Sequence, residues 1–167
     1  MADYVRAIDV DAFIRIQRIA GLPEEFNLAG IVTGMRLMLE DGRVFIMANI
    51  PAEIVDAVRT LKEGGQLGHD QRQSIFMLMI NHEALRETLT RGLKEVIIDE
   101  LDERTGLYTA KAVFSEDGVT LQLKMIPSHA VFLALLAGAP IYVRSELVDD
   151  YGGEMADIDE DDDIIDL

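Results

Sequence analysis

The chain has 167 residues, 49% of them hydrophobic, which is enough apolar material for the core of one domain. It contains no cysteine, so disulfides and thiolate zinc sites are excluded. The formal net charge is −16 and the bases are scattered, which disfavours tight, non-specific nucleic-acid binding by a monomer but still permits a local patch assembled in three dimensions. Because there is no signal peptide and no long apolar run, we expect a cytoplasmic protein that does not enter a membrane.

The first part of the chain predicts strands followed by a short helix. The expected strands cover residues 3–10, 28–39 and 43–47. Asp41-Gly42 is a typical hairpin turn, so the second and third of these strands should pair antiparallel. Pro51 then predicts the start of a helix, and Gly64-Gly65 predicts its end.

Residues 70–91 predict a longer helix with an apolar stripe. Asp70 is expected to cap its start, and Gln73 fits the spacing of a capping box. The stripe should pack against a sheet, and His82, which lies on it, should be a hydrogen-bonded core or interface histidine. Gly92 is expected to close the helix.

The second half of the chain predicts a β-meander and a buried helix. The expected strands are residues 93–101, 107–115 and 119–126, with a last short strand at 140–143 and a final helical turn at 145–151. A helix that opens at Pro127 and Ser128 and ends at Gly138 is apolar almost all round, so it should be buried against the sheet.

Together these elements indicate an α+β fold over residues 1–150: a mixed or antiparallel sheet, with a hairpin and a meander, packed against three to four helices. Residues 151–167 should form a disordered acidic tail, because residues 154–167 hold eight acids and no base. This tail is either a solubilising end or a docking peptide that places its terminal Ile-Ile-Asp-Leu in the apolar groove of a protein partner.

One segment carries a family resemblance. Residues 125–143 read MIPSHAVFLALLAGAPIYV and resemble the bifunctional nuclease (DNase/RNase) domain family, in which a strand ends in Arg-Pro-Ser-Asp-Ala and an Ala/Leu-rich helix leads through Gly-Ala-Pro-Ile to another strand. His69-Asp70 resembles the His-Asp pair of that family, and the order of elements agrees over residues 28–150. The resemblance implies an α+β fold, a homodimer and nuclease activity on DNA or RNA.

The chain departs from the family pattern at two positions. Ile126 stands where the family has an arginine that can hold phosphate, and His129 stands where it has an aspartate that can bind Mg²⁺ or accept a proton. The resemblance therefore implies the architecture more directly than the activity.

The candidate catalytic residues are His69, Asp70, Ser128 and His129. His129 is a general base or metal ligand at a helix start, or a surface residue there. Ser128 is an N-cap, or a nucleophile if a base lies beside it. Asp70 is equally explained as a helix cap and His69 as a loop residue.

Asp99 and Glu100 are the candidate metal ligands, because acidic residues that cluster at a strand end can bind a hard cation such as Mg²⁺ or Mn²⁺. A solvated turn is the alternative. The resulting hypothesis is metal-assisted phosphodiester hydrolysis, with His69 or His129 moving a proton. The competing hypothesis is a non-catalytic, dimeric interaction module with an acidic docking tail.

Overall fold

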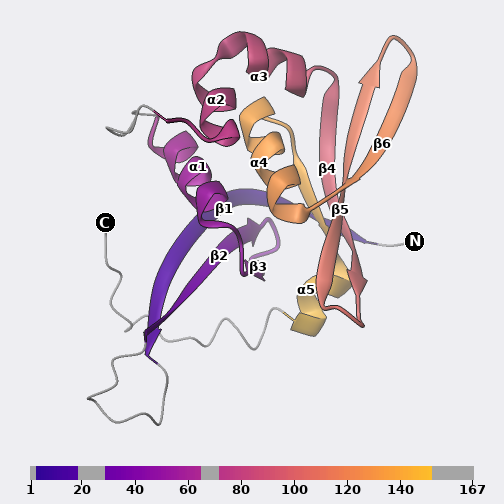
Figure 1. Ribbon diagram of the computed structural model, residues 1–167. Coiled ribbons are helices and arrows are strands. Elements are labelled where there is room, and N and C mark those ends of the chain that lie inside the picture. Colours follow the sequence, from indigo (N-terminus) through magenta and orange to yellow (C-terminus); the bar gives the residue numbers. More distant parts are fainter. Residues whose placement is uncertain (1–2, 19–28, 65–71, 152–167) are drawn as a thin grey trace.

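The computed structural model describes residues 3–18, 29–64 and 72–151 (Figure 1). These residues form a mixed sheet and a set of helices. In chain order the elements are β1 (Tyr4–Arg18), β2 (Ala29–Leu39), β3 (Val44–Ala48), α1 (Ala52–Glu63), α2 (Ile75–Asn81), α3 (Glu83–Thr90), β4 (Leu93–Asp102), β5 (Leu107–Glu116), β6 (Val119–Met125), α4 (Pro127–Ala137), β7 (Ile141–Arg144) and α5 (Ser145–Tyr151). The predicted α+β class is confirmed.

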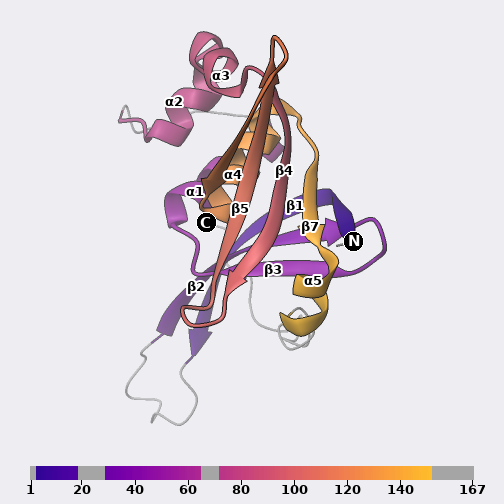
Figure 2. The same ribbon diagram turned by 90° about the vertical axis from the view of Figure 1, so that its right-hand side faces the viewer.

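The strands form one seven-stranded sheet in the order β3-β2-β1-β7-β4-β5-β6. All neighbours pair antiparallel except β4 and β7, which are parallel. The β4–β5–β6 meander and the β2–β3 hairpin are both present as predicted, and β1 joins them by pairing with β7 at its start and with β2 along the rest of its length. Figure 2 shows the upright β7, β4 and β5 strands, with α2 and α3 at the upper end of the molecule.

The core is organised around α4. Ala130, Val131, Phe132 and Ala134 are almost completely buried, and the helix packs on β4 and β5 as well as on α1 and α3. Because α4 is packed on several sides, little of its surface is left for polar residues, which explains its uniformly apolar sequence. The predicted buried helix is confirmed.

We expect Phe132→Ala to destabilise the protein by about 3–5 kcal/mol, because it removes a fully buried ring and leaves a cavity between α4 and its neighbours. Phe132 also lies edge-to-face against Phe76, with 5.2 Å between the ring centroids. Urea unfolding followed by circular dichroism measures the loss. Leu133→Ala, at a partly exposed position of the same helix, is the control and should cost less; equal losses would contradict the packing described here.

The first strand is longer than the sequence predicted, because β1 runs from Tyr4 to Arg18 instead of ending near residue 10. Its register shifts between Ala7 and Asp9. The buried positions are odd-numbered before the shift, as at Val5, and even-numbered after it, as at Val10 and Ala12. A β-bulge of this kind breaks the two-residue alternation by which a strand is recognised in a sequence.

The helix predicted over residues 70–91 is interrupted. Helix α2 begins after Ser74, whose side chain accepts a hydrogen bond from the Met77 amide at 3.3 Å, and the expected cap Asp70 lies outside the described residues. His82 separates α2 from α3 with extended backbone angles (φ −116°, ψ 101°). The expected core position of His82 is wrong, since its side chain is exposed.

The packing predicted for this helix is also wrong. Helix α3 has no buried residue, and Leu85 and Leu89 on the expected apolar stripe are each 47% exposed. Helix α4 occupies the sheet face, so α3 packs on α4 and α2 packs on α1. Within the part of the chain that the structure describes, none of the helices is long and apolar enough to cross a membrane.

Candidate functional site

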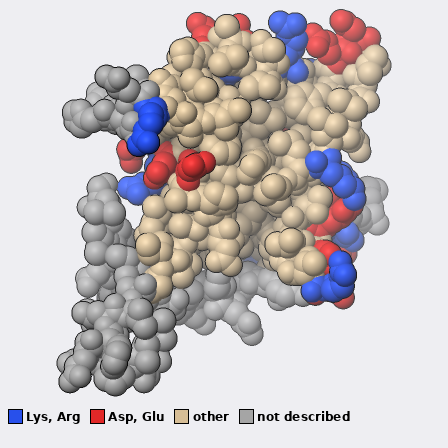
Figure 3. Space-filling view, viewed as in Figure 1, with Lys and Arg blue, Asp and Glu red and all other residues tan. Residues whose placement is uncertain are grey.

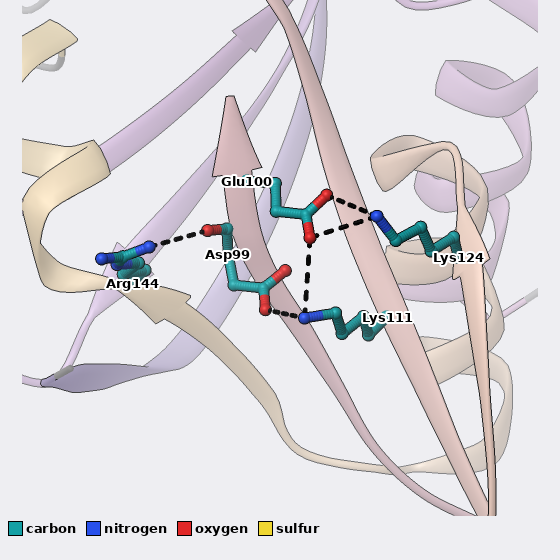
Figure 4. Close-up of polar contacts among 5 residues, drawn as sticks. All are labelled: Asp99, Glu100, Lys111, Lys124 and Arg144. Carbon is teal, nitrogen blue, oxygen red and sulfur yellow. Dashed lines mark hydrogen bonds and ion pairs between the residues drawn. The ribbon is translucent and has the colours of Figure 1, made fainter. Parts of the chain in front are cut away.

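Asp99 and Glu100 lie on the face of the sheet that points away from α4. Ala110 and Ala112 of β5 are fully buried on the side where α4 packs, so Lys111 between them points to the opposite side, which we call the outer face. A register shift in β4 just before Glu100 leaves two consecutive carboxylates beside Lys111 (Figure 4).

These side chains form a compact set of charges, which we call the outer-face cluster. Its members are Asp99, Glu100, Lys111, Lys124 and Arg144. The Lys111 ammonium lies 2.5 Å from Oδ2 of Asp99 and 3.8 Å from Oε1 of Glu100. Lys124 lies 2.9 Å from Oε2 of Glu100, and Nη1 of Arg144 donates to the backbone carbonyl of Asp99 at 3.5 Å. Three strands and the end of β7 therefore meet at this cluster.

Burial differs sharply within the cluster. Asp99 is only 7% exposed, whereas the side chains of Glu100 and Lys124 are 43% and 67% exposed. The hydrogen bond to Asp99 raises the pKa of Lys111, and partial burial opposes that shift. The hydrogen bond from Lys124 is the main reason why the pKa of Glu100 is lowered. At neutral pH the cluster therefore holds ionised Glu100 and protonated Lys111.

Two polar atoms of the cluster are buried without a hydrogen-bond partner among the described residues, namely Oδ1 of Asp99 and Nε of Arg144. A buried carboxylate oxygen in this state is costly unless something satisfies it. The cluster supplies only two carboxylates, and no group of three or more potential metal ligands occurs in the described ranges. Two carboxylates completed by water and phosphate oxygens are a usual set for Mg²⁺.

Ser128 and His129 lie elsewhere. The residue at the N-cap of α4 is Ile126, with Pro127 in the first turn, so the predicted N-cap role of Ser128 is wrong, and Ser128 is 95% buried inside the helix start. The His129 ring lies edge-to-face against Phe76 of α2, with centroids 5.5 Å apart, on the side of α4 that faces away from the sheet. These residues and the outer-face cluster are thus separated by the sheet.

The other predicted site residues, His69 and Asp70, lie outside the described residues. Ile126, which stands at the position of the family's arginine, is 62% exposed. The structure therefore brings together Asp99 and Glu100 but places neither Ser128 nor His129 beside them.

A family model described as the bifunctional nuclease domain matches residues 72–156, just over half of the chain. The chain belongs to the bifunctional nuclease domain family. A search of curated proteins gives no significant match. The match spans α2 to α5 of this bifunctional nuclease domain, so it includes the whole outer-face cluster. The elements before the matched residues are β1, β2, β3 and α1.

Sequence reasoning missed the three bases of the cluster in this bifunctional nuclease domain. Lys111 and Lys124 are directly opposite each other across β5 and β6. Like charges in such a pair repel, and here Glu100 lies within 4 Å of both ammonium groups. The one local signal is that Lys111 is a lone base in an apolar strand, flanked by two alanines.

We expect Lys111→Met to lower the free energy of unfolding by about 2–4 kcal/mol, because it leaves the carboxylate of Asp99 buried and unpaired. Combining it with Asp99→Leu should recover most of the loss, since the unpaired charge is then gone. Denaturant unfolding measures both effects. The control is Lys62→Met, which removes a pair with Asp9 whose side chains are 40% and 49% exposed, and it should cost about 0–1 kcal/mol.

The pair should also respond to alkaline pH. Because the folded pKa of Lys111 is raised above its usual value of 10.5, the folded state holds this proton more tightly than the unfolded chain. The stability that the pair contributes is therefore complete below pH 10.5 and is lost as pH rises through the folded pKa. The free energies of unfolding of wild type and Lys111→Met, measured between pH 8 and 12, should approach each other as the pH rises. A constant difference would contradict the assignment.

Proposed function

We propose that this bifunctional nuclease domain hydrolyses phosphodiester bonds of DNA or RNA, with Mg²⁺ or Mn²⁺ held by Asp99 and Glu100. The observation that carries the proposal is the buried, unpartnered Oδ1 of Asp99, which lies in a cluster that also offers Glu100 and three bases. The family match over these residues supports the same reaction class.

The cluster suits a divalent cation because its two carboxylates differ in mobility. Asp99 is buried and fixed by Lys111, so it would provide a preorganised oxygen. Glu100 is 43% exposed and bonded to the exposed Lys124, so it can turn toward a ligand without disturbing the core. A cation held by Asp99 and Glu100 would supply Lewis-acid polarisation of the phosphate and would lower the pKa of a nearby water molecule.

The bases of the cluster suit the substrate. Lys124 is 67% exposed, and its ammonium can reach a phosphate oxygen that approaches the outer face. Arg144 is 37% exposed, pairs with the exposed Glu146 at 2.7 Å, and bonds to the backbone carbonyl of Asp99. These two side chains would orient the phosphate and stabilise the charge that develops on it. Lys124 and Arg144 thus provide the positive charge that is missing at Ile126, which stands at the position of the family's arginine.

Proton transfer is assigned differently from the sequence hypothesis. His129 packs against Phe76 on the far side of the sheet from Asp99, so we give it no role in this proposal. His69, with Asp70, stays a candidate on the strength of the family resemblance. Ser128 is not proposed as a nucleophile, because it is 95% buried in the first turn of α4.

Labelled single-stranded DNA and RNA, incubated with the full chain and Mg²⁺ or Mn²⁺, test the proposal. We expect cleavage that Asp99→Asn and Glu100→Gln each reduce by about 10- to 100-fold, as is typical when a ligand shell is weakened. Asp11→Asn is the matched control, since Asp11 is paired with Arg36 at 2.8 Å on another part of the sheet, and it should leave the rate unchanged. His129→Phe should also be neutral.

Wild-type protein that cleaves no faster than the Asp99→Asn/Glu100→Gln double variant would remove the proposal. Loss of cleavage in His129→Phe would instead move the site to α4. Circular dichroism of each variant separates loss of activity from loss of fold.

A second candidate is a non-catalytic interaction module. Two observations favour it: both carboxylates of the cluster are paired with lysines, and the exposed Ile126 replaces the family's arginine. In this case residues 154–167 would bind a protein partner. A pull-down that compares the full chain with a chain ending at Gly153 separates the roles of the tail, because unchanged partners would make it a bystander.

A further inference from the structure

A second group of side chains lies on the outer face of the sheet, where β1 pairs with β7. Val5 and Val143 are opposite each other in this pair, and both are buried. Val143 also lies beside Ile98, which is opposite Ala110, so these buried residues share the α4 side of the sheet. Because side chains alternate along a strand, the residues on either side of the two valines point to the outer face. On β1 these are Tyr4 and Arg6, and on β7 they are Tyr142 and Arg144.

The register of the two strands places a tyrosine opposite an arginine twice. Tyr4 is opposite Arg144, and Arg6 is opposite Tyr142. The start of β1, which carries the first two of these residues, lies beside β7 in Figure 2. The tyrosines therefore occupy one diagonal of a two-by-two arrangement and the arginines occupy the other, and we call these four residues the Tyr/Arg square.

The Tyr/Arg square adjoins the outer-face cluster. Arg144 belongs to both, since it donates to the backbone carbonyl of Asp99. The pKa of Lys111 is raised chiefly by its hydrogen bond to Asp99, and Tyr4 adds to this rise, which places the phenol group near the Lys111 ammonium. A nucleic-acid strand with one phosphate at the outer-face cluster can therefore continue over the square.

The side chains of the square can be reached from solvent. Tyr4 is 45% exposed, and Arg6 is exposed as well. Among the described residues, neither Tyr4 nor Tyr142 packs against another aromatic ring. Arg144 pairs with Glu146, whose side chain is 68% exposed, and a surface pair of this kind is weak enough for a phosphate to displace the carboxylate.

The composition of the square points to its ligand. Aromatic rings bind the flat faces of unpaired bases by stacking, and guanidinium groups bind phosphates. The face of the molecule seen in Figure 3 is different, because it is largely uncharged and its Lys, Arg, Asp and Glu side chains gather toward the rim. The outer face at β1 and β7 thus offers rings and positive charge side by side, next to the cluster proposed to hold the reacting phosphate.

We propose that the Tyr/Arg square holds unpaired nucleotides of the substrate, with bases stacked on its tyrosines and the neighbouring phosphates bound by its arginines. In a duplex the faces of the bases are covered by the adjacent base pairs, so the square selects single-stranded segments. This inference rests on the proposed function for the position of the reacting phosphate at Asp99 and Glu100. The binding itself can be measured without cleavage.

Fluorescence anisotropy of short labelled oligonucleotides, with the full chain in EDTA, measures this binding. The probes are a single strand, an abasic strand of the same length, which keeps the phosphates but lacks the bases, and a blunt duplex. We expect the single strand to bind at least about tenfold more tightly than either of the other two, because only the single strand offers free base faces.

Tyr4→Leu should weaken binding of the single strand about tenfold and leave binding of the abasic strand unchanged, because it removes one stacking ring. Tyr4→Phe keeps the ring and should keep most of the affinity. Ile31→Ala, at a 71% exposed position on β2, is the control for loss of exposed apolar surface and should change neither affinity. Circular dichroism confirms that each variant is folded.

Arg6→Gln should have a different signature. It should weaken binding of the single strand and of the abasic strand alike, and it should lower the slope of log affinity against log salt by about one, because a phosphate contact is lost. The comparison with Tyr4→Leu separates contacts to phosphates from contacts to bases.

A wild type that binds the abasic strand or the duplex as tightly as the single strand overturns the inference, and so does a Tyr4→Leu variant with unchanged affinity. Either result leaves the proposed hydrolysis standing if Asp99→Asn still reduces cleavage. Base-dependent binding that Tyr4→Leu weakens, without any cleavage of the bound strand, supports the square and removes only the proposed hydrolysis.

Discussion

The burial of α4 is the constraint on which the rest of this fold depends. Phe132 and its neighbours fill the space between the sheet and the outer helices, and the strand residues Val96, Ile98, Ala110 and Ala112 are fully buried and apolar. Since side chains alternate along a strand, Lys111, which lies between the buried Ala110 and Ala112, points to the opposite face. The gathering of charges on the outer face is thus a consequence of where the apolar helix lies.

The two carboxylates reach that face together because β4 is irregular. In a regular strand Asp99 and Glu100 would point to opposite sides, and one carboxylate would enter the core below α4. The register shift beside them avoids this and leaves Asp99 buried but paired with Lys111. A buried ion pair of this kind contributes little net stability over apolar residues, so its presence is better explained by a role for the charges than by the needs of folding.

Local patterns in the sequence predicted the elements whose signals are themselves local. The uniformly apolar run around Phe132 identified the buried helix, and Asp41-Gly42, with a positive φ at Gly42, marked the turn of the β2–β3 hairpin. The break at His82 was missed because an apolar stripe continues on either side of it. The length of β1 was missed because its bulge reverses the alternation.

The candidate site was predictable only in part, and for a physical reason. Adjacent acids such as Asp99 and Glu100 stand out in a sequence, whereas their partners come from β5, β6 and β7 and are brought in by strand register. The register between strands depends on residues that are far apart in the sequence, so a short stretch of sequence does not reveal it. The same limit explains why Ser128 and His129, which belong to the segment that resembles the family, were grouped with residues that lie across the sheet from them.

The facing lysines of β5 and β6 carry a thermodynamic consequence. In the resting protein Glu100 pairs with Lys124 at 2.9 Å while Lys111 is held by Asp99, so the affinity of both lysines for an anion is masked. A cation that engaged Glu100 would release the ammonium group of Lys124, and by reciprocity an anion that drew this ammonium group away would strengthen cation binding. Metal and phosphate would then bind cooperatively on the outer face, each weak alone, through a coupling that resides in one shared carboxylate.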